Sequence, residues 1–421
     1  MKNICVLGLG YIGLPTAAMF ATHGFKVLGV DVKESVVELL NNEDVHIQEP
    51  GIKTLAQTAV KSSNLIASLK PDYADAFIIA VPTPFTKDDK KCDLSYVISA
   101  AESIVPFLQP GNLAILESTV PPRTTEDILV PILERSGLVV SRGEANPRGS
   151  LYVAHCPERV LPGSILKELV HNDRVIGGVD RAAAKMAKDL YASFVEGGIF
   201  LADTTTAEMV KLMENTYRDV NIALANEFAL VAEKVRINIW EAIELANRHP
   251  RVNILKPGPG VGGHCIAVDP WFIVQAAPDV TPLIQTTRQV NDGMPNYVAK
   301  MVKQAVMGVK RPVIACLGLT YKGDVDDIRE SPAIKVIELL RAEDFELRAY
   351  DPLVPLKTIP EQVSTIEAAL SGSDAILILT DHTAFKKLCL DNIHCPVIDT
   401  RDVLDADQRL TSFIFFGGSK I

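Results

Sequence analysis

The sequence predicts an α/β protein in which two Rossmann-like, doubly wound parallel sheets are joined by a central domain of long helices. Three observations carry this prediction. Short apolar runs alternate with helical patterns in the first part of the chain, and the same texture returns after residue 300. The segment between them contains almost no helix breakers. We therefore expect three domains, at residues 1–203, 204–300 and 301–421.

Composition limits the class of protein. The chain has 421 residues, of which 48% are hydrophobic, and this length suits two or three domains of roughly 150 residues each. No apolar run approaches the roughly 20 residues of a membrane span. Seven scattered cysteines without a CxxC pair favour a reducing cytoplasm over a disulfide framework. The net charge of -10 argues against nucleic acid as a partner. We expect a cytoplasmic protein with neither a membrane nor a nucleic-acid partner.

The first domain is predicted from four apolar runs that read as buried strands. Runs as short as these are typical of strands covered on both faces by helices. Helical patterns such as ESVVELLNN lie between them, and this alternation indicates a parallel sheet. The four predicted strands are 4–9 (ICVLGL), 26–31 (KVLGVD), 76–82 (AFIIAVP) and 113–119 (LAILEST).

The middle and last parts of the chain complete the prediction. Residues 204–247 carry apolar side chains at helical spacing, which predicts long helices between the two sheets. Such a helix often forms a dimer core, so we expect a homodimer. The second, smaller Rossmann-like domain is predicted from strands at 312–323, 346–352, 375–382 and 396–400.

A glycine motif, GLGYIG, follows the first predicted strand and opens a helix. Gly8 permits the tight turn, Gly10 lets the backbone approach a pyrophosphate, and Gly13 allows the helix to pack closely on the strand. Asp31 ends the second strand, where its carboxylate can bind a ribose and repel a 2'-phosphate. The spacing predicts a dinucleotide site with NAD rather than NADP. The alternative is a glycine turn that serves packing alone.

Other strand ends are expected to line the same crevice, because ligands of open parallel sheets bind beyond the carboxyl ends of the strands. The predicted cofactor-binding residues are Gly8, Gly10, Tyr11, Ile12, Gly13, Asp31, Val81, Pro82, Thr83, Ser118 and Thr119.

A second glycine-rich stretch, PGPGVGGHCIAVDPW at 257–271, presents Cys265. A reactive cysteine beside NAD suggests oxidation of an aldehyde through a thiohemiacetal and a thioester. A lone cysteine is more often a small buried hydrophobe, and this alternative stays open. A metal site with His264 is not expected, because adjacent side chains rarely converge on one ion and no further ligand cluster is present.

Candidate partners for this chemistry exist elsewhere in the chain. Lys211 and Asn215 are four residues apart on one helix face and can donate to an oxyanion. Asp269, Thr119 and Glu158 can hold or activate water. Each has a structural alternative: a solvated helix face for Lys211 and Asn215, an N-cap before Pro270 for Asp269, and a surface pair with Arg159 for Glu158.

Seven motifs in order resemble the UDP-sugar 6-dehydrogenases of the UDP-glucose/GDP-mannose dehydrogenase family. They span roughly residues 3 to 335: GLGYIGLP, VPTP, ESTVPP, CPERVLPG, AEMVKLMENTYRDVNIALANE, GPGVGGHCIAVDP and YKGDVDDIRESPA. The resemblance implies a four-electron oxidation, in which a UDP-sugar C6 alcohol becomes a carboxylate, two NAD are reduced in turn and one water is consumed.

The resemblance also implies residue roles. Cys265 is the nucleophile, Lys211 and Asn215 stabilise the oxyanion, and Asp269, Thr119 and Glu158 serve water and proton chemistry. The N-terminal domain binds NAD, the central helices form the dimer, and the C-terminal domain binds UDP. The implied substrate-binding residues are Arg159, Val160, Leu161, Lys211, Asn215, Arg251, Asn253, Gly262, Lys322 and Arg329, of which Arg251 matches an arginine that reaches the neighbouring subunit's site.

The sugar is suggested by the stretch NRHPRVNILKPGPGVGGHCIAVDPWF, which is most similar to family members that oxidise UDP-N-acetyl-D-mannosamine. UDP-glucose members usually have serine in place of His264, and SRGEANPRGSLYVAHCPERV is longer than in those members. UDP-N-acetylglucosamine is the second expectation and UDP-glucose the third. Two other classes stay open at this point: a two-electron β-hydroxyacid dehydrogenase, which does not need Cys265, and a non-enzymatic NAD-sensing or scaffold protein.

Overall fold

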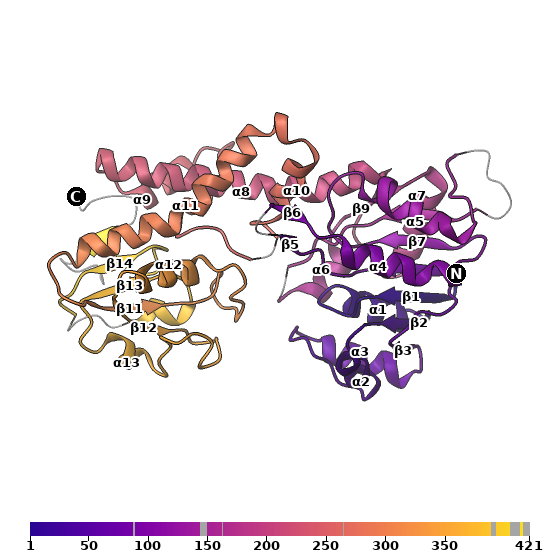
Figure 1. Cartoon of the computed structure of the whole chain (residues 1–421), viewed down its shortest axis with the longest axis horizontal. Helices are drawn as coiled ribbons and strands as arrows, with labels where there is room; N and C mark the ends of the chain where they lie inside the picture. Colours follow the sequence, from indigo (N-terminus) through magenta and orange to yellow (C-terminus); the bar gives the residue numbers. More distant parts are fainter. Residues whose placement is uncertain are drawn as a thin grey trace. The chain divides into compact units, whose positions relative to one another are not determined.

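The computed structural model describes residues 1–86, 89–143, 150–161, 163–263, 265–388, 393–404 and 413–415. It divides into two compact units (Figure 1), one formed by residues 1–214 with 271–278 and the other by residues 215–270 with 279–421. Each unit contains a sheet covered by helices, so the predicted α/β class is confirmed. No helix in the described part of the chain is long and apolar enough to cross a membrane.

The first unit is built on an eight-stranded sheet in the order β10-β9-β8-β7-β4-β1-β2-β3. The central strands are buried on both faces, which explains their unbroken apolar sequences. A two-stranded hairpin lies apart from this sheet. The strands are β1 (Asn3–Leu7), β2 (Lys26–Val30), β3 (Leu65–Ser68), β4 (Ala76–Ile79), β7 (Leu113–Leu116), β8 (Tyr152–His155), β9 (Arg174–Gly178) and β10 (Ile199–Asp203), and the hairpin pairs β5 (Phe85–Thr86) with β6 (Lys91–Cys92).

Helices cover both faces of this sheet (Figure 1) and enclose a separate hydrophobic core on each side. One core is shared with α1 (Gly13–Thr22), α2 (Glu34–Asn41), α3 (Ile52–Lys61), α6 (Ile165–His171) and α7 (Arg181–Tyr191). The other is shared with α4 (Ser95–Ile104), the π-helical turn η2 (Thr125–Leu129) and α5 (Val130–Leu133). Short 3-10 turns complete it at η1 (Val105–Phe107) and η3 (Glu134–Ser136).

The prediction of a parallel sheet needs one correction in this unit. β8 and β9 pair antiparallel, and β10 then pairs parallel with β9. The connection from β8 to β9 contains only the seven-residue α6. At about 1.5 Å per residue this helix is only roughly 10 Å long, too short to return the chain along the sheet, so β9 starts at the edge where β8 ends.

The predicted long helices are confirmed. α8 (Thr204–Val235) has 32 residues, of which 204–214 belong to the first unit and 215–235 to the second. It ends before Arg236, which has a φ of 62°. α9 (Ile239–Ala246) then begins behind the Asn238 side chain, which accepts from the Trp240 N–H. In the second unit, small residues on α8, such as Ala225 and Ala229, pack in the same core as Val298 of α11 (Pro282–Ala305).

The second unit contains a five-stranded sheet in the order β12-β11-β13-β14-β15. All of its recorded strand pairs are parallel, which confirms the second Rossmann-like prediction. Its strands are β11 (Val313–Leu317), β12 (Glu346–Tyr350), β13 (Ala375–Ile378), β14 (Val397–Asp399) and β15 (Phe413–Phe415). The remaining helices of the chain are α10 (Asp269–Ala276), α12 (Pro332–Arg341), α13 (Ile366–Leu370), η4 (Pro278–Val280) and η5 (Thr383–Lys387).

Candidate functional site

The turn after β1 has the backbone geometry that a pyrophosphate requires. Gly8 has a φ of +90°, and a Cβ there would lie 2.6 Å from the carbonyl oxygen of Ala80. A Cβ at Gly13 would lie 1.8 Å from the Gly8 carbonyl oxygen. At Gly10, by contrast, no atom lies within 4 Å of the corresponding position. The first and third glycines are therefore required by packing, and the second leaves the backbone open at the start of α1.

Asp31 fits the role of the ribose-binding acid. It directly follows β2, and its carboxylate accepts the Leu9 N–H at 3.0 Å and the Lys33 N–H at 2.9 Å. These two bonds join the acid to the glycine turn and fix its orientation. The turn and this carboxylate together fit the adenosine half of NAD.

The other predicted cofactor residues lie at neighbouring strand ends. β4 pairs with both β1 and β7, so residues 81–83 and 118–119 follow adjacent strands. The Ser118 hydroxyl donates to the Val81 carbonyl at 2.6 Å, and the Thr83 hydroxyl donates to the Thr119 carbonyl at 2.7 Å. The structure thus brings both loops to the sheet edge at which the glycine turn lies.

Glu158 is not the surface partner of Arg159. Its side chain is buried and pairs with Arg174, whose Nη2 lies 2.9 Å from Oε2, while its other oxygen accepts the Arg159 N–H at 2.8 Å. The guanidinium of Arg174 in turn lies over the Tyr191 ring, 4.8 Å from its centroid. The Glu158 side chain points into the protein because its partner, Arg174, is itself buried. The surface-pair alternative is therefore wrong.

The segment that follows Glu158 is tied to α8. The Arg159 side chain pairs with Glu214 of α8 at 2.9 Å, three residues beyond Lys211. The Leu161 N–H donates to Glu168 at 2.8 Å, and Val160 packs against the core. These contacts bring the predicted substrate segment 159–161 to the part of α8 that carries Lys211.

Lys211 and Asn215 do not form a solvated helix face. Lys211 is 8% exposed and Asn215 is 1% exposed. Within the described ranges, the Lys211 ammonium has neither a hydrogen-bond acceptor nor an acidic partner. The three N–H donors of this ammonium can therefore bind an anionic group placed beside it.

Two predicted catalytic residues bind each other in the second unit. The Asn215 amide donates to Asp269 Oδ2, and Arg218 donates to Asn215 Oδ1. The Cys265 carbonyl accepts the Val268 N–H at 3.0 Å and the Asp269 N–H at 2.8 Å. Cys265 therefore occupies the turn that leads into α10, and Asn215, Cys265 and Asp269 come together.

The glycine loop before Cys265 packs against the segment that carries Lys322 and Arg329. A Cβ at Gly262 would lie 2.6 Å from the Tyr321 Cβ, and the Gly263 N–H donates to the Arg329 carbonyl at 3.0 Å. Burial, and then the charges of Asp327 and Cys265, raise the pKa of Tyr321. The loop needs glycine because the other segment lies against its backbone. His264 lies outside the described residues.

The glycine-rich loop before Cys265 is held by a buried polar network that the sequence analysis missed. Asn226 of α8 accepts the Gly258 N–H at 2.8 Å and donates to Asn291 at 2.9 Å. Asn291 donates to Asp219 at 2.8 Å, and Arg288 donates to Asp219 at 2.6 Å. Burial raises the pKa of Asp219 to about 6. The available signal was the seven-residue spacing of Asp219 and Asn226, which places both on one face of α8.

Arg401 is a second residue that the sequence analysis missed. Its Nη2 donates to the Tyr321 carbonyl at 3.4 Å and its Nε to the Leu379 carbonyl at 3.3 Å. Its Nη1 lies 2.6 Å from the position of a Cβ at Gly258. Burial lowers the pKa of this guanidinium. It lies two residues beyond the end of β14, and this position near a strand end was the only signal in the sequence.

The other predicted substrate residues are spread over the second unit. The Asn253 carbonyl accepts from Asn221 of α8 at 2.8 Å, which holds residues 253–255 on the helix. Lys322 and Arg329 are exposed, and Arg329 pairs with Asp327 at 2.6 Å. Arg251 is exposed on the segment that follows α9.

The turn after β11 repeats the geometry of the turn after β1. The Gly318 N–H donates to the Tyr350 carbonyl at 2.8 Å, as Gly8 donates to Val30 at 2.7 Å. Asp351 occupies the position of Asp31 and accepts the Leu319 N–H at 2.7 Å. The second acid is buried, however, and also accepts from His382 Nε2 at 3.0 Å. Its ribose-binding position is therefore filled by a histidine of the same chain.

The fold and the first glycine turn define a dinucleotide-dependent dehydrogenase. Three models of the UDP-glucose/GDP-mannose dehydrogenase family match the chain: the NAD binding domain at residues 2–195, the central domain at 205–293 and the UDP binding domain at 315–406. The chain belongs to this family and is an NAD-dependent UDP-sugar dehydrogenase. The β-hydroxyacid dehydrogenase and the non-enzymatic alternative are thereby set aside.

Relatives and solved structures agree with this assignment. A UDP-N-acetyl-D-mannosamine dehydrogenase of Methanocaldococcus jannaschii is 51% identical over 96% of this chain and 93% of its own length. The structure of a UDP-D-ManNAc dehydrogenase from Pyrococcus horikoshii matches with a TM-score of 0.90 and 44% identity over 99% of both chains. That of a UDP-N-acetyl-mannosamine dehydrogenase from Staphylococcus aureus matches with a TM-score of 0.89 and 46% identity, also over 99% of both chains.

Proposed function

We propose that this enzyme oxidises the C6 alcohol of UDP-N-acetyl-D-mannosamine to a carboxylate. The observation that carries the proposal is the hydrogen-bonded arrangement of Asn215, Asp269 and the Cys265 turn, packed against the segment with Lys322 and Arg329. The choice of sugar is supported by the relative and the two structures described above, whose names give this substrate.

The chain's own residues divide the chemistry between them. NAD, when bound at the turn after β1 and Asp31, accepts a hydride from C6 in each of the two oxidations. The Cys265 thiolate adds to the C6 aldehyde and forms a thiohemiacetal, and loss of the second hydride leaves a thioester. Lys211 and Asn215 donate to the oxygen that carries negative charge in both tetrahedral species. Water then cleaves the thioester, which yields the carboxylate and frees the thiol.

Acid–base roles follow from the partners of each group. Asp269 orients the Asn215 amide and accepts a proton from the attacking water. Thr119 holds that water, and Glu158, which is fixed by Arg174, supports the same proton transfer. We assign residues 1–203 to NAD binding, 204–300 to the central helical domain and 301–421 to UDP binding.

The nucleotide part of the substrate needs positive charge. Lys322 and Arg329 serve this role in the last domain, and Arg401 adds a guanidinium beside the same loop. Asn253 and the backbone at Gly262 complete the pocket, together with Arg159, Val160 and Leu161 for the sugar.

We further propose a cytoplasmic homodimer. One face of α8 exposes Tyr217, Leu224, Phe228, Val231 and Val235, which are spaced by seven, four, three and four residues. This spacing is that of a helix seam that packs against another helix. A second copy of the chain fits such a self-complementary face, and Arg251 is assigned to the neighbouring subunit's site. The six described cysteines are free thiols, which suits a reducing compartment.

The proposal is tested by counting NADH formed per UDP-N-acetyl-D-mannosamine consumed. About two NADH per sugar are expected for the wild type, with this yield lost in Cys265→Ser. Cys395→Ser changes a half-buried thiol elsewhere in the second unit and serves as the control. One NADH per sugar, or an unaffected Cys265→Ser variant, would contradict the thioester mechanism. Competition with UDP-N-acetylglucosamine and UDP-glucose tests the sugar, and a preference for either would reassign it.

A further inference from the structure

Glu208 is a buried acid of α8 that the proposed mechanism does not use. It is 1% exposed, and both of its oxygens accept hydrogen bonds from the loop between β7 and η2. Oε2 accepts the Arg123 N–H at 2.5 Å, and Oε1 accepts the Thr125 N–H at 2.8 Å and the Thr125 hydroxyl at 2.6 Å. All three donors belong to the segment that follows Thr119.

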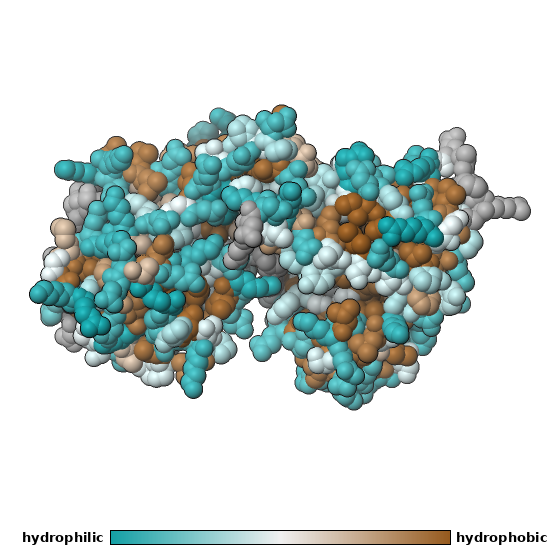
Figure 2. Space-filling model, in the orientation of Figure 1, coloured by the Kyte–Doolittle hydropathy of each residue, from teal (hydrophilic) through white to brown (hydrophobic). Residues whose placement is uncertain are grey.

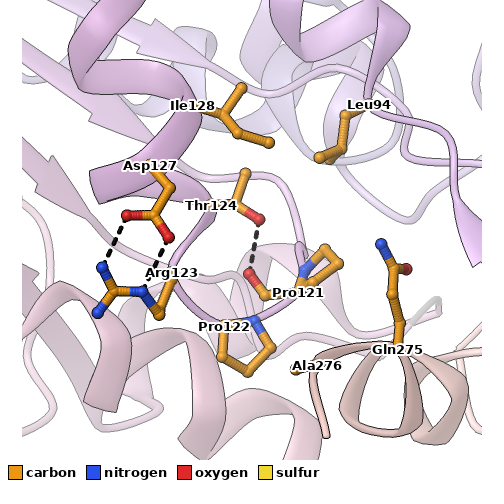
Figure 3. Close-up of a pocket in the computed structure, with 9 residues that line it drawn as sticks. All are labelled: Leu94, Pro121, Pro122, Arg123, Thr124, Asp127, Ile128, Gln275 and Ala276. Carbon is orange, nitrogen blue, oxygen red and sulfur yellow. Dashed lines mark hydrogen bonds and ion pairs between the residues drawn. The ribbon is translucent and has the colours of Figure 1, made fainter. Parts of the chain in front are cut away.

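The loop that Glu208 binds has an unfavourable backbone. Arg123 has a φ of 73°, in the left-handed region that residues with a Cβ rarely occupy. Its side chain turns outward and forms two bonds with Asp127, at 2.7 and 2.8 Å (Figure 3). Such a conformation persists only where its surroundings hold it, and Glu208 binds the N–H of this same residue.

Packing alone does not hold the loop, because a cavity of about 160 Å³ lies beside it. Figure 3 shows the loop residues on one side of this cavity and Gln275 of α10 on another. Figure 2 shows the surface of this face of the molecule coloured by hydropathy. The cavity is lined by Leu94, Pro121, Pro122, Arg123, Thr124, Asp127, Ile128, Gln275 and Ala276.

Glu208 and the loop that it binds each lie close in sequence to a predicted catalytic residue. Thr119 lies four residues before Arg123 in the same loop, and its carbonyl is fixed by Thr83. Lys211 lies three residues after Glu208, which places both on one face of α8. A single carboxylate therefore connects the loop of the water-holding threonine to the helical turn of the oxyanion-binding lysine.

We propose that Glu208 is a positioning residue that fixes the loop 119–125 on α8 and thereby sets Thr119 relative to Lys211. This inference rests on the proposed function, which gives Thr119 and Lys211 their roles. A displaced Thr119 misplaces the water that cleaves the thioester, whereas formation of the thioester needs Cys265, Lys211 and Asn215 only. Loss of Glu208 should therefore slow the hydrolytic half of the reaction more than the first oxidation.

The contact should also depend on pH. The pKa of Glu208 is raised to about 7, because burial and the charge of Glu126 on η2 together outweigh the lowering effect of the bonds from Thr125 and Arg123. The charged groups that face it are Glu126 and the Arg123 guanidinium with its partner Asp127. Because the pKa of Glu208 in the folded protein lies above its ordinary value of 4.5, the protonated acid favours the folded contact. The contact therefore weakens as the pH rises through about 7.

The test compares Glu208→Gln with Asp127→Asn, a control that removes the exposed partner of the Arg123 side chain but leaves the loop backbone bound. kcat and KM are measured from roughly pH 5.5 to 9, and the covalent adduct on Cys265 is quantified by mass spectrometry of acid-quenched enzyme. We expect kcat of Glu208→Gln to fall by about tenfold or more, with KM for the sugar nearly unchanged. The thioester adduct should accumulate, and the decline of kcat above about pH 7 that titration of Glu208 causes should be absent from the variant's profile.

Two outcomes would overturn the inference. One is a kcat and adduct level for Glu208→Gln within about twofold of those for Asp127→Asn. The other is a decline of kcat above about pH 7 that persists unchanged in Glu208→Gln. If Glu208→Gln does not fold, Thr125→Val removes one of the three donors and should give a smaller effect in the same direction. A wild type without any Cys265 adduct would instead contradict the proposed function, so the two failures are distinguishable.

Discussion

Glu117 directly follows β7 and is enclosed within the first unit. It is 1% exposed, the Tyr191 hydroxyl donates to it at 2.9 Å, and Thr16 donates at 3.3 Å. Its pKa is raised to about 8, because burial and the charge of Glu158 together outweigh the opposing charge of Arg174. Glu117 is therefore mostly protonated at neutral pH and forms a neutral hydrogen-bonded group next to the paired Glu158 and Arg174.

Glu117→Gln should change how stability depends on pH. A carboxyl whose pKa is raised on folding stabilises the protein below its unfolded pKa of 4.5, and this contribution is lost as the pH rises through about 8. Glutamine mimics the protonated acid and does not titrate. Between about pH 5 and 8, the free energy of unfolding of the wild type should therefore fall relative to the variant by about 1–3 kcal/mol.

Urea unfolding of both proteins at several pH values measures this difference. Glu102→Gln, at an exposed acid paired with Arg135, is the matched control and should give a difference that does not vary with pH. Parallel stability curves for the wild type and Glu117→Gln would contradict the assignment.

At the scale of secondary structure, the sequence predicts correctly those strands and turns that local sequence patterns determine. Four strands of each sheet and the first glycine turn were found, because apolar runs and GxGxxG spacing are local patterns. The reversal of β9 was missed, because strand direction depends on where the connecting chain packs. Glu208, Asn226 and Arg401 were missed for the same kind of reason, since their partners lie far away in the sequence. The roles assigned to the predicted site residues remain predictions.

His382 offers a test of one such long-range contact. It is completely buried; its Nδ1 accepts the Asp324 N–H at 3.0 Å, and its Nε2 lies 3.1 Å from the Thr320 hydroxyl, which donates to the Lys322 carbonyl at 2.8 Å. His382 thus holds both ends of the short loop around Lys322. His382→Asn should weaken binding of UDP by about tenfold and leave binding of NAD unchanged, because the two nucleotides use different domains.

Isothermal titration with UDP and with NAD measures both affinities. His394→Asn, at an exposed histidine of the same unit, is the control. In a double-mutant cycle, His382→Asn and Lys322→Ala should be non-additive, since the histidine acts through the lysine. Additive losses, or equal losses for UDP and NAD, would show that His382 has only a general structural role.

At the scale of the whole molecule, the exposed seam on α8 predicts the state of assembly. A stable interface needs about 800 Å² from each partner, and the seam from Tyr217 to Val235 extends over five turns of helix. Phe228→Glu places a charge within the seam and should convert a dimer into a species near the chain mass of 45.8 kDa. Size-exclusion chromatography with light scattering measures this mass.

The control for that experiment is Met307→Glu, at another exposed hydrophobic residue of the second unit. It should leave the mass unchanged. A wild type that is already monomeric at micromolar concentration, or a Phe228→Glu variant that stays dimeric, would contradict the proposed seam.

The hydrogen bond between His382 and Asp351 bears on how two dinucleotides can bind in the course of one reaction. All of the acceptor positions of Asp351 are used within the chain, by Leu319, Leu353, Val354 and His382. Of the two glycine turns, only the first retains an acid that can receive a ribose. Both oxidations then use the same NAD-binding site in succession. The partly oxidised sugar therefore stays bound while NADH is replaced by NAD. In the proposed mechanism, the covalent bond to Cys265 retains the aldehyde during that exchange.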